Sequence, residues 1–132
     1  MKKIYLILNL LLFSLILSSK SIANWENTNW TKLFTSDGIS VYVDYDRVRE
    51  KSGFIYYRKL YDRTTPNKLG SYSVMEVIQG DCAAFRLKIL DQHQHKNQMG
   101  KGSYQSIPGD GQWKYPKSNQ FLGYVLEQVC NR

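Results

Sequence analysis

The sequence predicts a mainly β domain of the α+β class that ends in a single helix. Apolar and polar residues alternate in residues 83–89, which is the period of a strand with one buried face. In residues 121–129 apolar residues recur at spacings of three and four, which is the period of a helix with one buried face. The two cysteines, Cys82 and Cys130, lie next to these two segments. A disulfide between them would tether the helix to the sheet.

The N-terminus has the pattern of a secretory signal peptide. Lys2 and Lys3 precede a run of apolar residues, 4–17, and the small residues of the 21–23 segment follow it. The alternative, a membrane anchor, needs an apolar run of about 20 residues. We therefore expect cleavage after Ala23 and a single mature domain, residues 24–132, with no membrane span. No cysteine stands at the cleavage site, so we expect no N-terminal lipid anchor.

Export sets the compartment and limits the partners. In an oxidising compartment two cysteines form a persistent disulfide, so we expect the Cys82–Cys130 bond. Loss of Lys2, Lys3 and Lys20 with the signal lowers the net charge from +7 to +4. This mild excess favours weak attraction to acidic glycans or proteins, while export argues against nucleic acid as a partner. We expect a periplasmic, secreted or cell-surface protein.

The remaining elements follow from alternation and turn residues. An Asp37-Gly38 turn joins two strands into a hairpin, and a charged connection, 45–52, with one helical turn follows. Glu76 shares a strand face with Val74, so we expect that face to be partly exposed. Glycines and prolines indicate a long surface loop over 99–116. The expected strands are residues 30–34, 39–44, 54–63, 71–79 and 80–90, and Trp113 and Tyr115 are expected to anchor the loop by burying aromatic area.

No residue pattern indicates catalysis. His93 and His95 would face the same way on a strand, but zinc and copper sites need three or four ligands. We expect an exposed polar strand end there instead. Asp44 and Asp46 are better explained as turn residues than as paired catalytic carboxylates. The sequence therefore predicts no catalytic residue, no metal site and no cofactor.

Tyrosines and cations on two of the strands suggest a recognition surface. Tyrosine and arginine contribute most to such surfaces because they are large, amphipathic and lose few rotamers on binding. Ordinary strand tyrosines flanked by solvated charges explain the pattern equally well. The candidate binding residues are Tyr56, Arg58, Lys59, Tyr61, Arg63, Arg86 and Lys88.

Several short motifs, in their order and spacing, resemble the bacterial surface-adhesin protein E family. They are the segments 41–44, 80–82, 99–102, 113–116 and 129–130, together with the tyrosine-rich strand 54–63. The resemblance covers residues 30–132. It implies a single antiparallel sheet of about six strands with a C-terminal helix tied to it by the disulfide, and adhesion to host matrix or plasma proteins.

The sequence thus predicts an exported, non-enzymatic protein that binds a protein or glycan ligand, such as a host matrix protein or an envelope component. Exposed strand edges would also allow a homodimer. The alternative is a periplasmic enzyme inhibitor or chaperone-like envelope factor that presents the 99–116 loop.

Overall fold

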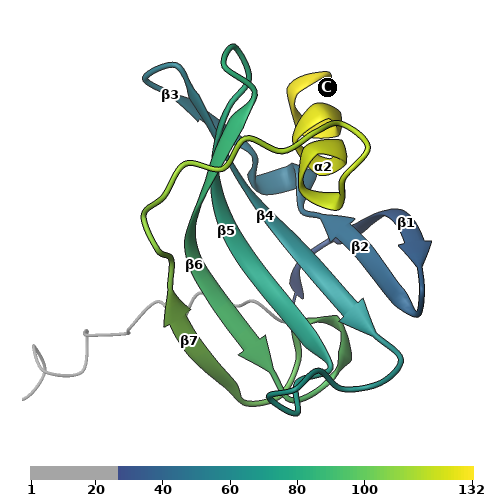
Figure 1. The fold of residues 1–132 in the computed structure, drawn as a ribbon. Helices are drawn as coiled ribbons and strands as arrows, with labels where there is room; N and C mark the ends of the chain where they lie inside the picture. The colour runs from purple at the N-terminus through teal and green to yellow at the C-terminus, as the bar shows by residue number, and fades with distance from the viewer. Residues whose placement is uncertain (1–26) are drawn as a thin grey trace, which may run out of the picture.

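Seven strands form one antiparallel sheet within residues 27–132, the part of the chain that the computed structural model describes (Figure 1). The strand order is β1-β2-β4-β5-β6-β7, and β3 pairs with the first residues of β4. The expected fold class is confirmed, and β3 and β7 are strands in addition to those expected from the sequence. The elements are β1 Thr31–Ser36, β2 Ile39–Val43, η2 Tyr45–Arg47, β3 Arg49–Lys51, β4 Phe54–Arg63, β5 Ser73–Asp81, β6 Arg86–His95, η3 Gln98–Gly100, β7 Tyr104–Pro108 and α2 Phe121–Cys130. The predicted cleavage after Ala23 lies outside the described residues.

Helix α2 lies across one end of the sheet, on the face that we call the helix face (Figure 1). Val125, Leu126 and Val129 of α2 are buried against apolar side chains of the strands. The strand residues of this core are Val41, Val43, Ile55, Tyr57, Ile78 and Leu87. Because successive strand residues point to opposite faces, the other residues of each strand project from what we call the opposite face.

Gly80 lets the helix approach the sheet closely. A Cβ at this position would lie 2.9 Å from Leu126 Cδ1 and 2.9 Å from Ile55 Cγ2. Both distances are shorter than real Cβ contacts, so a larger residue would push α2 away from β5. This close approach explains why a glycine, and not a larger apolar residue, stands two positions before Cys82.

Cys82 lies in the turn between β5 and β6, and its disulfide to Cys130 joins this turn to the last residue of α2. The expectation of one strand over residues 80–90 was wrong in this respect, because β5 ends at Asp81 and β6 begins at Arg86. Phe85 closes the turn with a φ of 49°. Because Cys82 lies in the turn, its side-chain direction does not follow the alternation of β6. It can therefore bond to the helix although Arg86 and Lys88 project from the opposite face.

Strand β6 and its neighbour extend further than expected. Residues 91–95 continue β6, and β7 pairs with them along the edge of the sheet. The expectation of an unstructured loop over 99–116 was wrong for this part. Strand β7 is an edge strand, so one row of its backbone groups has no partner strand. Residues 104–108 accordingly show little of the apolar alternation that marks a central strand.

Candidate binding surface

The structure divides the seven candidate binding residues between the two faces of the sheet. Lys59, Tyr61 and Arg63 occupy alternate positions of β4 on the helix face, in line with the core residue Tyr57. The other four project from the opposite face; they are Tyr56, Arg58, Arg86 and Lys88. Because successive strand residues point to opposite faces, the odd-numbered and even-numbered residues of 54–63 must lie on different faces, and this could have been read from the sequence. The seven residues therefore do not form one continuous surface.

Lys59 is fully buried and links β4 to β5 through an ion pair. Its Nζ lies 2.7 Å from Glu76 Oε2 on β5 and donates a hydrogen bond of 2.7 Å to Tyr61 Oη. Glu76 Oε1 accepts a bond of 2.8 Å from Gln92 Nε2 on β6. Both ionised groups are paired, as buried charges must be. Glu76 is 4% exposed, so the expectation of a partly exposed strand face at this residue was wrong.

Arg58 is committed to an internal contact as well. Its guanidinium donates a hydrogen bond to Asp44, a carboxylate with no exposed surface, which Arg47 Nη1 also contacts at 3.0 Å. The Arg58 side chain is 12% exposed, and burial lowers its pKa. Asp44 thus joins the end of β2 to β4, and Arg58 offers little to an external ligand.

Arg86 and Lys88 do reach the surface, where they flank the indole of Trp113. Arg86 Cζ lies 4.1 Å from the centre of the Trp113 ring, and Lys88 Nζ lies 4.5 Å from it. The rings of Trp113 and Phe54 also lie close together, with their centroids 5.7 Å apart. Tyr115 is 68% exposed, and its Oη lies 3.5 Å from Arg86 Nη1. We call Phe54, Arg86, Lys88, Trp113 and Tyr115 the aromatic–basic patch.

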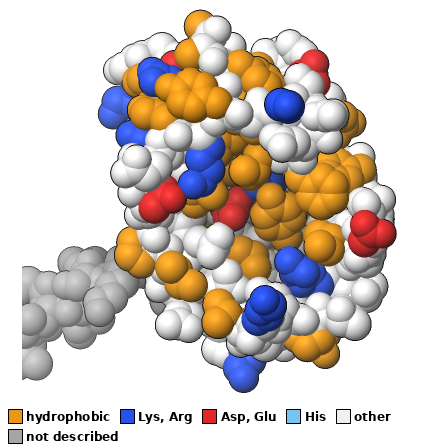
Figure 2. Space-filling view, in the orientation of Figure 1, with side chains coloured by type: hydrophobic (Ala, Val, Ile, Leu, Met, Phe, Trp, Pro, Cys, Tyr) orange, Lys and Arg blue, Asp and Glu red, His pale blue; other side chains and the backbone are white. Residues whose placement is uncertain are grey.

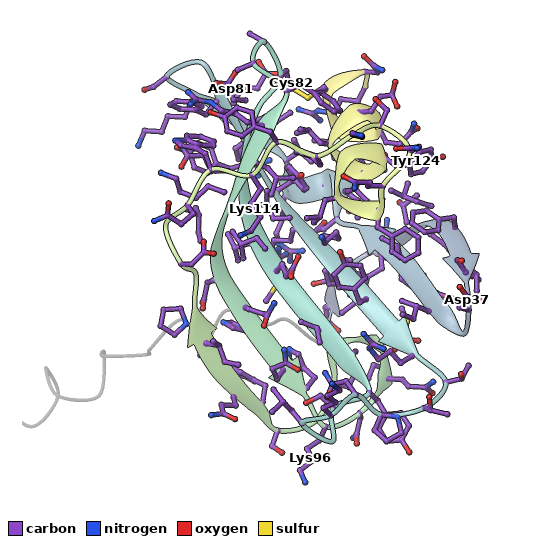
Figure 3. All side chains as sticks on the ribbon, in the orientation of Figure 1. Asp37, Asp81, Cys82, Lys96, Lys114 and Tyr124 are labelled. Carbon is purple, nitrogen blue, oxygen red and sulfur yellow. A yellow bond between two sulfur atoms is a disulfide. The ribbon has the colours of Figure 1, made fainter. Side chains whose placement is uncertain are left out.

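A short backbone bridge places the two aromatic residues of the 113–115 segment on this patch. The N–H of Lys114 donates to the carbonyl of Leu87 at 2.7 Å, and the N–H of Leu87 donates back to the carbonyl of Lys114 at 2.9 Å. Lys114 therefore lies beside β6, as the labelled stick view shows (Figure 3). Its neighbours Trp113 and Tyr115 project from the opposite face, alongside Lys88 and Arg86. The expectation that both aromatics are buried was wrong for Tyr115.

The patch lies near the end of the molecule where the β3–β4 and β5–β6 hairpins terminate. Figure 2 shows Lys and Arg side chains beside hydrophobic ones at the upper left, in the region of β3 in Figure 1. The register pairs Arg49 with Tyr56 and Lys51 with Phe54, which adds two exposed cations on the same face. Positive charge thus continues from β6 to β3.

Asp81 orients Arg86 within the patch. Asp81 Oδ2 accepts a bond of 2.9 Å from Arg86 Nε, and Oδ1 accepts one of 3.1 Å from the backbone N–H of Ala84. The Ala84 bond and then the Arg86 bond hold the pKa of Asp81 below its usual range. Asp81 therefore fixes the position of Arg86 through Nε and leaves the two terminal guanidinium nitrogens of Arg86 to other contacts.

A groove adjoins the patch between the two hairpins. Its volume is about 480 Å³, and its lining includes Lys51 and Phe54 on one side and Ala83 and the Cys82–Cys130 disulfide on the other. Lys51 and Phe54 therefore belong to both the groove and the basic face. A ligand lying on the patch has room to continue into this groove.

His93 and His95 are buried at the other end of the opposite face, where both rings contact the half-exposed ring of Tyr104. The ring centroids of His93 and Tyr104 are 4.6 Å apart, and those of His95 and Tyr104 are 5.0 Å apart. The two histidines are 6% and 2% exposed, so the expectation of an exposed strand end was wrong. Among residues 27–132, no three His, Cys, Asp or Glu side chains come together as a metal site would require.

Acidification is expected to destabilise the fold through His95. Burial, and then the charge of His93, lower the pKa of His95 below 6.5, its usual value in unfolded chains. As the pH falls through about 6.5, the unfolded chain takes up the proton first, so the free energy of unfolding should decrease. Urea unfolding at pH 7.5 and pH 5.5 measures this decrease. A His95→Gln variant should show a smaller difference between the two pH values, and an equal difference would contradict the assignment.

The model of the family described as surface-adhesin protein E matches residues 30–131, which is nearly all of the described chain. The chain belongs to the surface-adhesin protein E family. No curated protein sequence matches it. The family assignment agrees with the order of short motifs along the chain.

Two solved structures of Haemophilus influenzae protein E have the same fold. Crystal form II aligns with a TM-score of 0.59 at 12% identity and covers 76% of this chain and 96% of that one. The other structure aligns with a TM-score of 0.55 at 12% identity, covering 79% and 95%. At this identity, the likeness to protein E extends to the fold.

Membership in the surface-adhesin protein E family makes this an adhesin-like surface binding protein. The family implies an exported or cell-surface location and indicates a non-enzymatic role. No helix within residues 27–132 has the length and apolar character needed to cross a bilayer.

Proposed function

We propose that this protein is an exported, non-enzymatic adhesin that binds an anionic protein or glycan through the aromatic–basic patch. One observation carries the proposal: Trp113 lies against two partly exposed cations, Arg86 and Lys88, at 4.1 and 4.5 Å. Cation–aromatic stacking of this kind restrains side chains that would otherwise lose rotamer freedom on binding. The family suggests host or extracellular partners such as matrix proteins, and an envelope component is the other candidate partner.

The face used for binding differs from the one that the tyrosine-rich strand suggests. Lys59 and Arg58 are held by Glu76 and Asp44 and serve the stability of the sheet. Of the candidate residues, the proposed binding surface keeps Arg86 and Lys88. It adds three aromatic residues, Phe54, Trp113 and Tyr115. The aromatic members contribute the area and rigidity that recognition hot spots need.

The alternative of an inhibitor that presents residues 99–116 has no structural observation in its favour. Strand β7 fixes the middle of this segment to β6, and the Lys114–Leu87 bridge fixes its later part. Short stretches between these contacts are left to project. We therefore retain the adhesin proposal alone.

Reversing the charge of the patch is expected to abolish adhesion. An Arg86→Glu/Lys88→Glu variant should bind immobilised matrix or envelope components at least 10-fold more weakly, because both cations would become repulsive to an anionic ligand. Surface plasmon resonance against these preparations measures the change.

The matched control is Lys68→Glu/Lys96→Glu, which alters net charge equally at two exposed lysines. Lys96 lies at the opposite end of the molecule from Asp81 and Cys82 (Figure 3). The control should bind like the parent protein. Equal losses in both variants would show that only net charge matters, and unchanged binding in the patch variant would remove the patch from the adhesion.

A further inference from the structure

The two cations of the patch, Arg86 and Lys88, each end a row of residues that crosses the sheet to a cation of β3, Lys51 or Arg49. One row contains Lys51 and Phe54, which pair between β3 and β4, and Asp81 and Arg86, which pair between β5 and β6. Phe54 and Asp81 each lie one residue beyond the Ile55–Gly80 pair that joins β4 to β5. Three strand spacings separate its ends, which is about 14 Å. Such a separation exceeds the size of a single phosphate or carboxylate group. It fits an extended ligand that carries anionic groups at intervals.

The second row repeats this order one pair further along the strands. It runs from Arg49 through Tyr56 and Gln79 to Lys88. Each row thus has a cation at both ends and an aromatic residue between them. Asp81 is the single carboxylate in the two rows, and its oxygens already accept bonds from Arg86 and Ala84. The face therefore presents an uncompensated positive charge to a ligand.

We infer that these rows bind a polyanionic glycan, that is, a carbohydrate chain bearing sulfate or carboxylate groups. The inference rests on the proposed function and names the ligand class of the same surface. Tyr115, which is 68% exposed, offers a flat ring surface, and the four cations offer N–H donors for the anionic groups. The groove of about 480 Å³ beside Lys51 and Phe54 is also lined by Glu50, so the anionic groups are assigned to the two rows of cations and not to the groove.

A peptide ligand fits this surface less well. Bound peptides commonly add a strand to a free sheet edge. Beside the patch, Lys114 already occupies the edge of β6, since both of its backbone bonds to Leu87 are formed. Recognition there must use side chains, whose charges and rings suit a substituted sugar chain.

A lipid surface fits less well for a different reason. Binding to a bilayer surface requires apolar side chains that can enter the boundary between headgroups and acyl chains. Trp113 is instead packed against Phe54 and half-buried. The ring that would insert into a bilayer is therefore held against the sheet.

The test is a binding titration of the full mature protein with a highly sulfated glycosaminoglycan. The same chain after chemical desulfation, poly-glutamate and vesicles with anionic phospholipid are the comparison ligands. We expect the sulfated chain to bind most tightly. Affinity should fall at least 10-fold between 50 and 500 mM salt, because exposed charge pairs are screened.

Neutral substitutions identify the residues. An Arg86→Gln/Lys88→Gln variant should bind the sulfated chain at least 10-fold more weakly, and Lys51→Gln should weaken it by a smaller factor. The matched control, Lys68→Gln/Lys96→Gln, should bind as the parent does. Circular dichroism and thermal unfolding establish that each variant is folded.

The outcomes separate this inference from the proposed function. Tighter binding to poly-glutamate or to vesicles would overturn the glycan assignment, as would equal binding to the sulfated and desulfated chains. If the glycan does not bind but the charge-reversed patch still loses adhesion, the inference fails and the proposed function stands. If the charge-reversed patch keeps its adhesion, the proposed function fails.

Discussion

Replacing Glu76 with glutamine is expected to lower the free energy of unfolding by about 3–5 kcal/mol, because it leaves the buried Lys59 without its counter-ion. The substitution keeps the shape of the side chain and an oxygen to accept the bond from Gln92. The loss therefore reports on the unpaired charge and not on a cavity. Urea or guanidinium unfolding followed by circular dichroism measures it.

The control is a double variant that removes both charges, Lys59→Met/Glu76→Leu. Replacing a buried ion pair with apolar residues of similar volume is often neutral or stabilising. The double variant should therefore be more stable than Glu76→Gln, although it breaks the hydrogen bonds of Tyr61 and Gln92 to the pair. If Glu76→Gln changed the free energy of unfolding by less than about 1 kcal/mol, the ion pair would not hold the sheet as described.

Removal of the disulfide has the second large expected effect. The bond joins residues 48 positions apart, and the chain-entropy model assigns about 4 kcal/mol to a loop of this size. A Cys82→Ala/Cys130→Ala variant should lose about that much free energy of unfolding. Helix α2 should become susceptible to proteolysis first, because a ten-residue helix is marginal by itself.

Reduction provides the matched comparison for this variant. The parent protein in excess reductant should approach the stability of the double alanine variant, and the variant should not respond to reductant at all. Both measurements use equilibrium denaturation with and without a dithiol reagent. A parent protein whose stability is insensitive to complete reduction would contradict a stabilising role for the bond.

The local elements were largely predictable because each depends on nearby residues. The aromatic-rich composition typical of strands predicted residues 54–63 as a strand, and β4 has the same bounds. The Asp37-Gly38 turn also appears as predicted, with positive φ at both residues. Strand β7 was missed, because an edge strand requires little apolar alternation and its pairing partner, β6, lies elsewhere in the sequence.

The candidate site was predictable only in part. Arg86 and Lys88 were identified from their strand face, and the structure places both beside Trp113. That neighbour depends on the bridge between Lys114 and Leu87, two residues that are distant in the chain. Lys59 was taken for a surface cation, because its buried partner Glu76 is known only from the β4–β5 register.

By itself, the sequence determined the mainly β class, the C-terminal helix and the pairing of Cys82 with Cys130. These follow from short-range periodicity and from a cysteine count that allows one disulfide. The tertiary structure decided which charges are buried and which are offered to a ligand. Burial depends on what covers each face of the sheet, and strand register and helix docking set this across long separations. The same contacts therefore assign Lys59 to the interior of the sheet and Arg86 to the patch.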